Sequence, residues 1–254
     1  MRTISPIAAV AAAVLLIGLA GAATAGTSAA TPSGRVAVTS GTAGAGRAVP
    51  AAFRNARQNP YFPLRPGTVS RYRGSADGER YVETVTVTRR HRVISGVPTT
   101  VVRDVVRRTD GTLAERTTDW YAPDRHGTVW YFGERTATFD ERGRLESREG
   151  SWRDGVAGAR RGVVMPAHPR PTDAYRQELR VGHAEDQAWI VQRGLRVRVP
   201  YGRVRQAIRS LEWTRLEPGV VSAKIYAPGL GIVRERDLAG GDERFELVSV
   251  SRPR

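Results

Sequence analysis

The sequence predicts an all-β protein built from antiparallel strands, and two observations carry this prediction. Short runs of β-branched and aromatic residues recur along the chain, and turns that contain glycine separate them. One stretch, residues 119–134, holds two of the five tryptophans and is typical of a strand, a turn and a second strand. This aromatic hairpin is the expected centre of the core.

The start of the chain has the features of an export signal. Arg2 precedes a continuous apolar run at 7–20, and residues 23–25 form a small-x-small cleavage site. The run is shorter than the about 20 residues that a membrane span needs. We expect a signal helix over residues 1–25 that is cleaved after Ala25, with an uncleaved anchor as the alternative. The protein is then secreted or extracytoplasmic and associated with the cell envelope, with no transmembrane span in the mature chain.

The rest of the chain divides into a linker and a domain. Residues 26–57 are rich in small residues and bury too little apolar surface to fold, so they are an expected disordered linker. Residues 58–254 form a single all-β domain. A proline-rich segment, residues 153–174, could divide two similar halves of one sheet.

Strand signals follow one another through the predicted domain. At 81–88 valine alternates with threonine, which is the period-two signature of a strand. The basic run at 89–92 is predicted to lie where this strand ends in a turn, and 204–208 could form one helical turn. Strands are expected near 68–73, 81–88, 99–108, 113–120, 129–132, 135–139, 145–152, 175–181, 189–192, 195–199, 211–213, 220–226, 232–238 and 244–250.

A short pattern occurs twice. Tyr-Ala-Pro stands at 121–123 and again at 226–228, each time before a glycine turn and a β-branched strand start. An internal repeat would place two similar hairpins in one sheet. Two ordinary hairpins that look alike by chance are the alternative.

Composition excludes several classes of function. The chain has no cysteine, which excludes disulfides, thiol nucleophiles and thiolate metal sites. Its net charge is +15, and Lys224 is the only lysine among 40 basic residues. Nucleic-acid binding is not expected, because the arginines are spread along an exported chain with acids between them. Weak attraction to anionic polymers or headgroups of the cell envelope is more plausible physically.

Three segments occur together in a fixed order, and a resemblance rests on them. They are Tyr61-Phe62-Pro63-Leu64 with Pro66-Gly67, then Val199-Pro200-Tyr201-Gly202, then Tyr226-Ala227-Pro228-Gly229-Leu230-Gly231. With them the chain resembles secreted bacterial proteins of unassigned function and is similar to TapB-like periplasmic families. The resemblance covers residue 59 to the C-terminus. It implies a strongly curved antiparallel sheet, a half-barrel or barrel like that of lipoprotein carriers, and it carries over no catalytic residue.

Few residues suggest catalysis or metal binding. The four histidines show no tight ligand spacing, and the best polar cluster is at 183–186, His-Ala-Glu-Asp, which a solvated turn also explains. Asp119 and Glu134 flank the aromatic hairpin and could serve a hydrolase. Pairing with Arg116 or Arg135 across strands is the simpler interpretation. We therefore expect no cofactor, no metal site and no assigned catalytic residue.

The aromatic residues leave a binding function as the main hypothesis. Trp120, Trp130, Tyr121 and Tyr131 are the candidate ligand-binding residues, since some of them could line a concave face. Filling of the core is the competing explanation. The predicted function is that of an exported, non-enzymatic domain that acts as a monomer and holds an apolar or amphiphilic ligand or an extended peptide. A cell-envelope interaction protein with an arginine-rich surface is the first alternative, and a hydrolase using Asp119 or Glu134 is the second.

Overall fold

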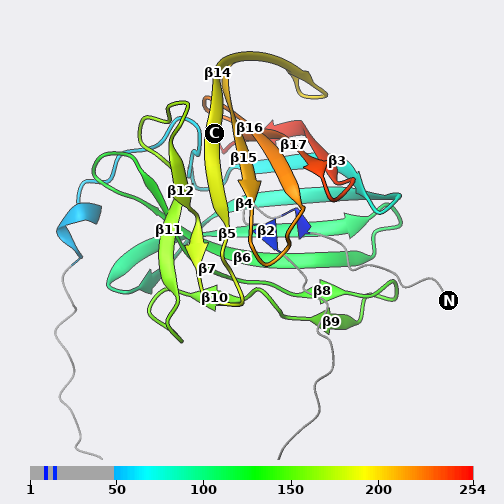
Figure 1. Cartoon of the computed structure of the whole chain (residues 1–254), viewed down its shortest axis with the longest axis horizontal. Coiled ribbons are helices and arrows are strands. Elements are labelled where there is room, and N and C mark those ends of the chain that lie inside the picture. The colour runs from blue at the N-terminus through cyan, green and yellow to red at the C-terminus, as the bar shows by residue number, and fades with distance from the viewer. Residues whose placement is uncertain (1–8, 11–13, 16–48, 254) are drawn as a thin grey trace, which may run out of the picture.

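One large antiparallel sheet makes up the protein (Figure 1). The computed structural model describes residues 9–10, 14–15 and 49–253. Sixteen strands form the sheet, and thirteen of them follow one continuous path from β12 through β14–β18 and β3–β7 to β11 and β13. The predicted all-β class is confirmed. No helix in the described ranges is long and apolar enough to cross a membrane.

The strands have the following bounds: β3 Val69–Ala76, β4 Glu79–Ile94, β5 Val97–Arg108, β6 Leu113–Pro123, β7 Val129–Arg135, β8 Thr138–Phe139, β9 Leu145–Ser147, β10 Trp152–Arg153, β11 Arg160–Met165, β12 Ala174–Arg176, β13 Glu178–Leu179, β14 Gln187–Val199, β15 Gly202–Trp213, β16 Val221–Ala227, β17 Gly231–Ala239 and β18 Arg244–Ser251. A two-stranded sheet, β1 Ala9–Val10 and β2 Val14–Leu15, lies within the predicted signal segment. One 3₁₀ helix, η1 Ala51–Phe53, lies within the predicted linker. Residues 1–8, 11–13 and 16–48 of these two predicted segments lie outside the described residues.

The sheet curves until its two ends approach each other. The last strand, β18, pairs with the first strand of the domain, β3, so the two halves of the chain are continuous in the sheet. At the other side β12 and β11 are in contact, and the Tyr175 hydroxyl of β12 lies 3.5 Å from the Val164 carbonyl of β11, to which it donates. The sheet is therefore a nearly closed barrel, as the resemblance implied.

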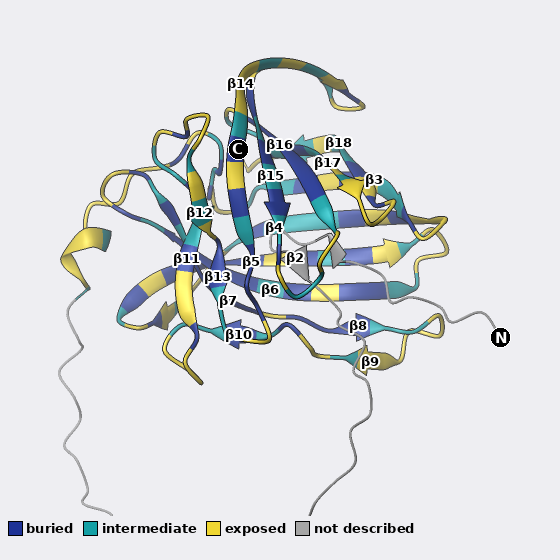
Figure 2. Cartoon of the chain, viewed as in Figure 1, coloured by how far each residue is buried: buried dark blue, intermediate teal, exposed yellow. Residues whose placement is uncertain are grey.

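The inner face of the barrel can be assigned from packing. Valines of β4 and β5 and tyrosines of β6 and β7 share one apolar cluster with residues of β14, β15 and β16. Side chains from opposite walls meet only inside a curved sheet. Figure 2 shows buried residues along the middle of these strands and exposed residues in the loops at their ends. Val85, Val87, Val102, Tyr121 and Tyr131 therefore face inward.

A segment before the first strand covers one end of the barrel. We call residues 59–67 the cover segment. Its Asn59 amide donates to the carbonyls of Gly127 and Pro166 at 2.8 and 2.9 Å, and the Pro60 carbonyl accepts from the Gly229 amide at 2.7 Å. These bonds fix it to two loops and a hairpin, and Phe62 and Leu64 pack into the inner cluster. The prediction that this segment tucks onto the core is confirmed.

Charge is divided between the inside and the outside. Twelve of the 25 acidic residues are buried, whereas no arginine of residues 49–253 is. Neighbouring side chains of a strand point to opposite faces. In these strands many acidic side chains point inward, whereas the arginines point outward. The surface consequently carries more positive charge than the sequence total of +15 suggests.

Two local predictions are wrong. The segment 204–208 lies within β15 and forms no helical turn; Gln206 has a positive φ of 55°, and this irregularity breaks the simple period of two. The basic run at 89–92 does not end a strand, because β4 continues to Ile94 through a register shift between Val87 and His91. Exposed strand residues need no apolar pattern, so the sequence signal stops before the strand does.

The two Tyr-Ala-Pro segments do lie in corresponding hairpins of the same sheet. Tyr121 stands near the end of β6 before the turn to β7, and Tyr226 near the end of β16 before the turn to β17. Both side chains are fully buried and point into the barrel.

Candidate functional site

The four candidate aromatic residues separate onto two faces of the sheet. Tyr121 and Tyr131 are direct partners in the β6–β7 register, and their rings stack inside the barrel with centroids 4.7 Å apart. Trp120 and Trp130 belong to a cluster on the outer face. Trp120 and Trp130 are not direct partners, because a register shift places Ala122 opposite Trp130.

The outer cluster is covered by residues upstream of the sheet. Phe53 of η1 lies edge-on against Phe132 and Trp130, with centroid distances of 5.5 and 6.4 Å. The Arg92 guanidinium lies 4.5 Å from the centre of the Trp120 ring. Since the two tryptophans are on the outer face, they do not line the concave face on which a ligand was expected.

A cavity opens on the inner face beside Tyr121. Its volume is about 80 Å³, and it lies between the cover segment, β3 to β5 and the start of β17. Most of its wall is apolar and includes Phe62, Leu64, Val85 and Val102. Two acidic residues, Glu83 and Glu235, also line it. We call this space the inner pocket.

The carboxyl groups of the inner pocket have perturbed acidity. Burial, together with the negative charge of Asp104, raises the pKa of Glu83 well above its usual range. Burial also raises the pKa of Glu235 to about 7, against the opposing charge of Lys224. One oxygen of each carboxyl group, Oε2, has no hydrogen-bond partner among the described residues. The polar part of the pocket therefore combines a neutral carboxyl group with one that titrates near neutral pH.

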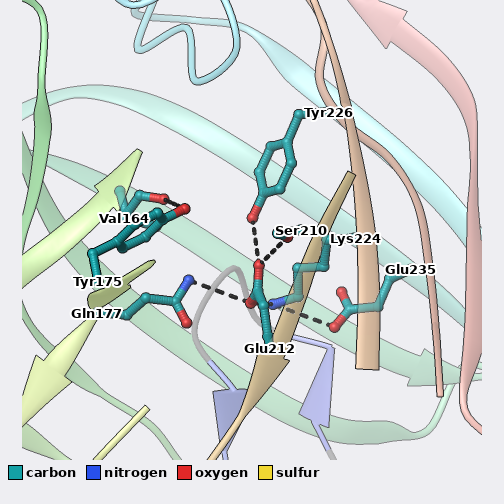
Figure 3. Close-up of polar contacts among 8 residues, drawn as sticks. All are labelled: Val164, Tyr175, Gln177, Ser210, Glu212, Lys224, Tyr226 and Glu235. Atoms are coloured by element: carbon teal, nitrogen blue, oxygen red, sulfur yellow. Dashed lines mark hydrogen bonds and ion pairs between the residues drawn. The ribbon is translucent and has the colours of Figure 1, made fainter. Parts of the chain in front are cut away.

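Behind Glu235 lies the only lysine of the chain (Figure 3). Lys224 is fully buried, and its Nζ lies 3.1 Å from Oε2 of Glu212 and 3.3 Å from Oε1 of Glu235. Burial lowers the pKa of Lys224, but the two carboxylates outweigh burial and raise that pKa well above its ordinary value. The ammonium group is therefore charged, and it holds β15, β16 and β17 together from inside the barrel.

Glu212 is the best-connected member of this triad. Its Oε1 accepts hydrogen bonds from Ser210 at 2.7 Å and Tyr226 at 3.1 Å, while Oε2 accepts from Gln177 at 3.3 Å. Figure 3 shows these groups converging on Glu212, with Glu235 on the far side of Lys224. Buried polar groups tolerate low dielectric surroundings when their hydrogen-bonding capacity is filled in this way. Glu212 is thus held in place by its hydrogen bonds, whereas Glu235 also lines the inner pocket.

Asp119 and Glu134 lie opposite each other, as predicted. Both point inward, and neither forms an ion pair with Arg116 or Arg135, so the interpretation as cross-strand ion pairs is wrong. The Tyr131 hydroxyl donates to Asp119 Oδ1 at 2.8 Å. Burial raises the pKa of Asp119 to about 7, and burial with the charge of Asp119 raises that of Glu134 further.

Burial limits what this carboxyl pair can do. The exposed fractions of Asp119 and Glu134 are 1% and 2%, so neither is presented to a saccharide. The inward direction of Glu134 comes from a bulge in β7, where Gly133 has a φ of 130°. The geometry therefore does not favour the hydrolase hypothesis.

The residues of the His-Ala-Glu-Asp segment do not converge. His183 is exposed, Glu185 accepts from Arg215 at 3.0 Å and from the Gly182 amide at 2.7 Å, and Asp186 is buried. The Arg215 hydrogen bond lowers the pKa of Glu185, while burial raises that of Asp186 to about 7. Within residues 49–253 no group of three potential ligands is arranged to hold a metal ion.

Sequence reasoning missed the acidic residues of the inner pocket, although one signal was present. Glu83 has the same parity as Val85 and Val87 in the alternating run at 81–88, and shared parity places it on their face. Lys224 was a second signal, because a single lysine among 40 basic residues indicates a position where an arginine is not suitable. Glu235 lies in a charged run and carried no comparable signal.

Comparisons with known proteins give few relatives. No protein-family profile matches the sequence, and no curated protein matches it. Two solved structures are similar in shape. One is a protein of Bacteroides fragilis, inferred to be exported, with a YmcC-like fold: identity is 14%, 76% of this chain and 100% of that chain are covered, and the TM-score is 0.44.

The second is an inferred lipoprotein of Parabacteroides distasonis. Identity is 11%, the alignment covers 77% of this chain and 100% of that one, and the TM-score is 0.41. Neither name states an activity. The resemblance to TapB-like families has no counterpart among these matches.

Proposed function

We propose that this protein is an extracytoplasmic binding protein that holds a small amphiphile in the inner pocket. The observation that carries the proposal is the combination of apolar walls with Glu83 and Glu235 in one cavity. Pockets with mostly apolar walls and a few convergent polar groups of perturbed acidity are typical binding sites. The small volume of the inner pocket, about 80 Å³, favours a small ligand over an extended peptide.

The chemistry of the pocket selects the polar group of the ligand. The apolar chain would lie against Val85, Val87 and Val102 of β4 and β5. The polar group would face Glu83 and Glu235, each of which has a free buried oxygen. A hydrogen-bond donor or cation satisfies these oxygens, whereas an anionic group would add charge to buried carboxyls. We therefore propose an amine or hydroxyl group at this end.

Three ligands of equal chain length test this selection. Isothermal titration calorimetry at pH 7 should show the tightest binding for 1-hexylamine, weaker binding for 1-hexanol and the weakest for hexanoate. Equal affinity for all three would contradict the role of the carboxyl groups. Binding of none of them would contradict the proposed function.

Two valine variants on opposite faces of β4 provide matched controls. Val85→Phe places a ring in the inner pocket and should abolish hexylamine binding. Val82→Phe adds the same volume on the other face, where the side chain is 37% exposed, and should leave binding unchanged. Thermal melting of both variants separates loss of binding from loss of fold. If Val85→Phe folds and binds like the parent, the ligand does not occupy the inner pocket.

The location belongs to the same proposal. The exported and lipoprotein names of the two structural neighbours are consistent with the predicted signal peptide, and we expect the protein to act as a monomer. Protein purified from the producing cell should begin near Gly26 when its N-terminus is sequenced. A mature protein that retains Met1 would contradict cleavage.

A further inference from the structure

A second cavity lies beside Trp120 where β10 pairs with β7, and its lining is basic. Its volume is about 350 Å³, which falls in the range of small-molecule sites. We call it the arginine cleft. It is lined by Arg92, Arg135, Arg153 and Arg180, with Trp120, Trp152, Ser151, Glu134, Val156 and Ala157.

The four arginines are not neutralised by carboxylates. Within residues 49–253 none of them lies in an ion pair. Asp154, which follows Arg153 in the chain, already forms an ion pair with Arg161, with Oδ2 and Nη1 2.8 Å apart. Glu134 supplies little negative charge, because burial and the charge of Asp119 raise its pKa well above the usual range. The cleft therefore presents a group of like charges that lacks a counter-ion from the protein.

The guanidinium groups are close together and are partly fixed. Burial and the charges of Arg153 and Arg135 lower the pKa of Arg92, so these groups repel one another in the free protein. The Arg92 guanidinium is held 4.5 Å from the Trp120 ring centre, and Arg180 Nη1 donates to the Ser151 carbonyl at 2.8 Å. Ala157, in the loop lining the cleft, has a left-handed φ of 50°. Strain and repulsion of this kind are retained where a site is organised before its ligand arrives.

We propose that the arginine cleft binds a phosphate group. Guanidinium forks match the oxygens of phosphate in bidentate pairs, and several converging arginines match a multiply charged anion better than a single carboxylate. The phosphate could be free or could be an ester at the end of a larger envelope molecule. The arginine cleft shares no lining residue with the inner pocket, so this proposal is independent of the proposed function.

The test uses defined anions at constant ionic strength. Fluorescence of the cleft tryptophans and calorimetry would follow titration with inorganic phosphate, pyrophosphate, glycerol 3-phosphate and acetate. Saturable binding of the phosphate compounds, at least tenfold tighter than that of acetate, is expected. Preference for glycerol 3-phosphate over inorganic phosphate would identify an ester as the natural source, and the reverse would identify the free ion.

Substitutions distinguish a site from general surface charge. Arg153→Gln should weaken pyrophosphate binding at least tenfold, and Arg135→Lys, which keeps the charge but loses the planar fork, should also weaken it. Arg205→Gln removes the same charge from an exposed position on β15 and should change affinity less than twofold. Equal losses in Arg153→Gln and Arg205→Gln, or equal binding of acetate and phosphate, would overturn the proposal. If Arg153→Gln fails to fold, the exposed Arg135→Lys variant decides the question alone.

Discussion

Replacing Lys224 with methionine removes the only buried cation of the described structure and keeps nearly the same side-chain volume. Lys224 is fully buried between Glu212 and Glu235, with N–O distances of 3.1 and 3.3 Å. Breaking a buried ion pair from one side costs about 3–5 kcal/mol, because the remaining charge has neither water nor a partner. We expect Lys224→Met to lose about this much unfolding free energy at pH 8, which is above the pKa of about 7 of Glu235.

The cost should depend on pH in a defined direction. The charge of Lys224 lowers the pKa of Glu235, so without the ammonium group Glu235 binds its proton more tightly and the folded variant carries more protons than the folded parent. Each additional proton makes the stability difference shrink by about 1.4 kcal/mol per pH unit as the pH falls. At pH 5 the variant should therefore approach the parent, since Glu235, whose pKa is about 7, is already neutral there in both proteins.

Urea denaturation followed by tryptophan fluorescence measures this difference at pH 5 and pH 8. The double variant Lys224→Met with Glu235→Gln is the control, because it removes one of the two unpaired charges and should recover part of the loss at pH 8. A loss below 1 kcal/mol at pH 8, or the same loss at both pH values, would refute the reasoning. Either result would mean that the triad is hydrated or that its charges are not ionised in the parent.

Two further predictions follow from the interior. The parent protein should be more stable at pH 5 than at pH 8. Burial raises the pKa values of Asp119 and Glu235 to about 7, above their values in the unfolded chain. The contribution of these two protonated groups to the unfolding free energy is therefore complete below about pH 4 and is lost as the pH rises through 7. Thermal melts across this range check it, and a maximum at pH 8 would contradict it. Gly133→Ala should lower the unfolding free energy by about 1–3 kcal/mol through overpacking. Gly133 has a φ of 130°, and a Cβ at this position would lie 2.7 Å from the Arg153 Cα. Gly78→Ala, with φ 78° and nothing within 4 Å, should show only the left-handed backbone cost of about 1–2 kcal/mol, and equal costs in urea titrations would contradict the crowding argument.

Most of the fold could be predicted from local sequence patterns. The alternation at 81–88 and the aromatic hairpin at 119–134 identified strands that lie in the middle of the sheet. These signals are strong where one face of a strand is buried and apolar. They fail where a strand continues into solvent, as at 89–94, and where a bulge changes parity, as at Gly133 and Gln206.

The candidate site was harder to predict, because its main residues are charged. Charged residues are expected on the surface, since burial of an isolated ion is costly. Asp104 illustrates the difficulty. In β5 it follows Arg103 and precedes Val105, and the charged pair suggests a surface position, yet the exposed fraction of Asp104 is 2%. The pairing of β4 with β5 brings Glu83 and Asp104 together on the inner face, and burial there becomes possible because proton uptake lowers their charge.

The same reasoning explains why position 224 is a lysine in a chain that otherwise uses arginine. An arginine there would bring five N–H donors and a rigid planar group into a space where only two carboxylate oxygens lie within reach of the cation. Each donor left without an acceptor inside the barrel would cost about 1–3 kcal/mol. An ammonium group is smaller, and its flexible stem lets it sit between Glu212 and Glu235. The arginines of residues 49–253 are not buried, so water can accept hydrogen bonds from the N–H groups that have no protein partner. Four of these arginines line the arginine cleft, where we propose that they bind a phosphate.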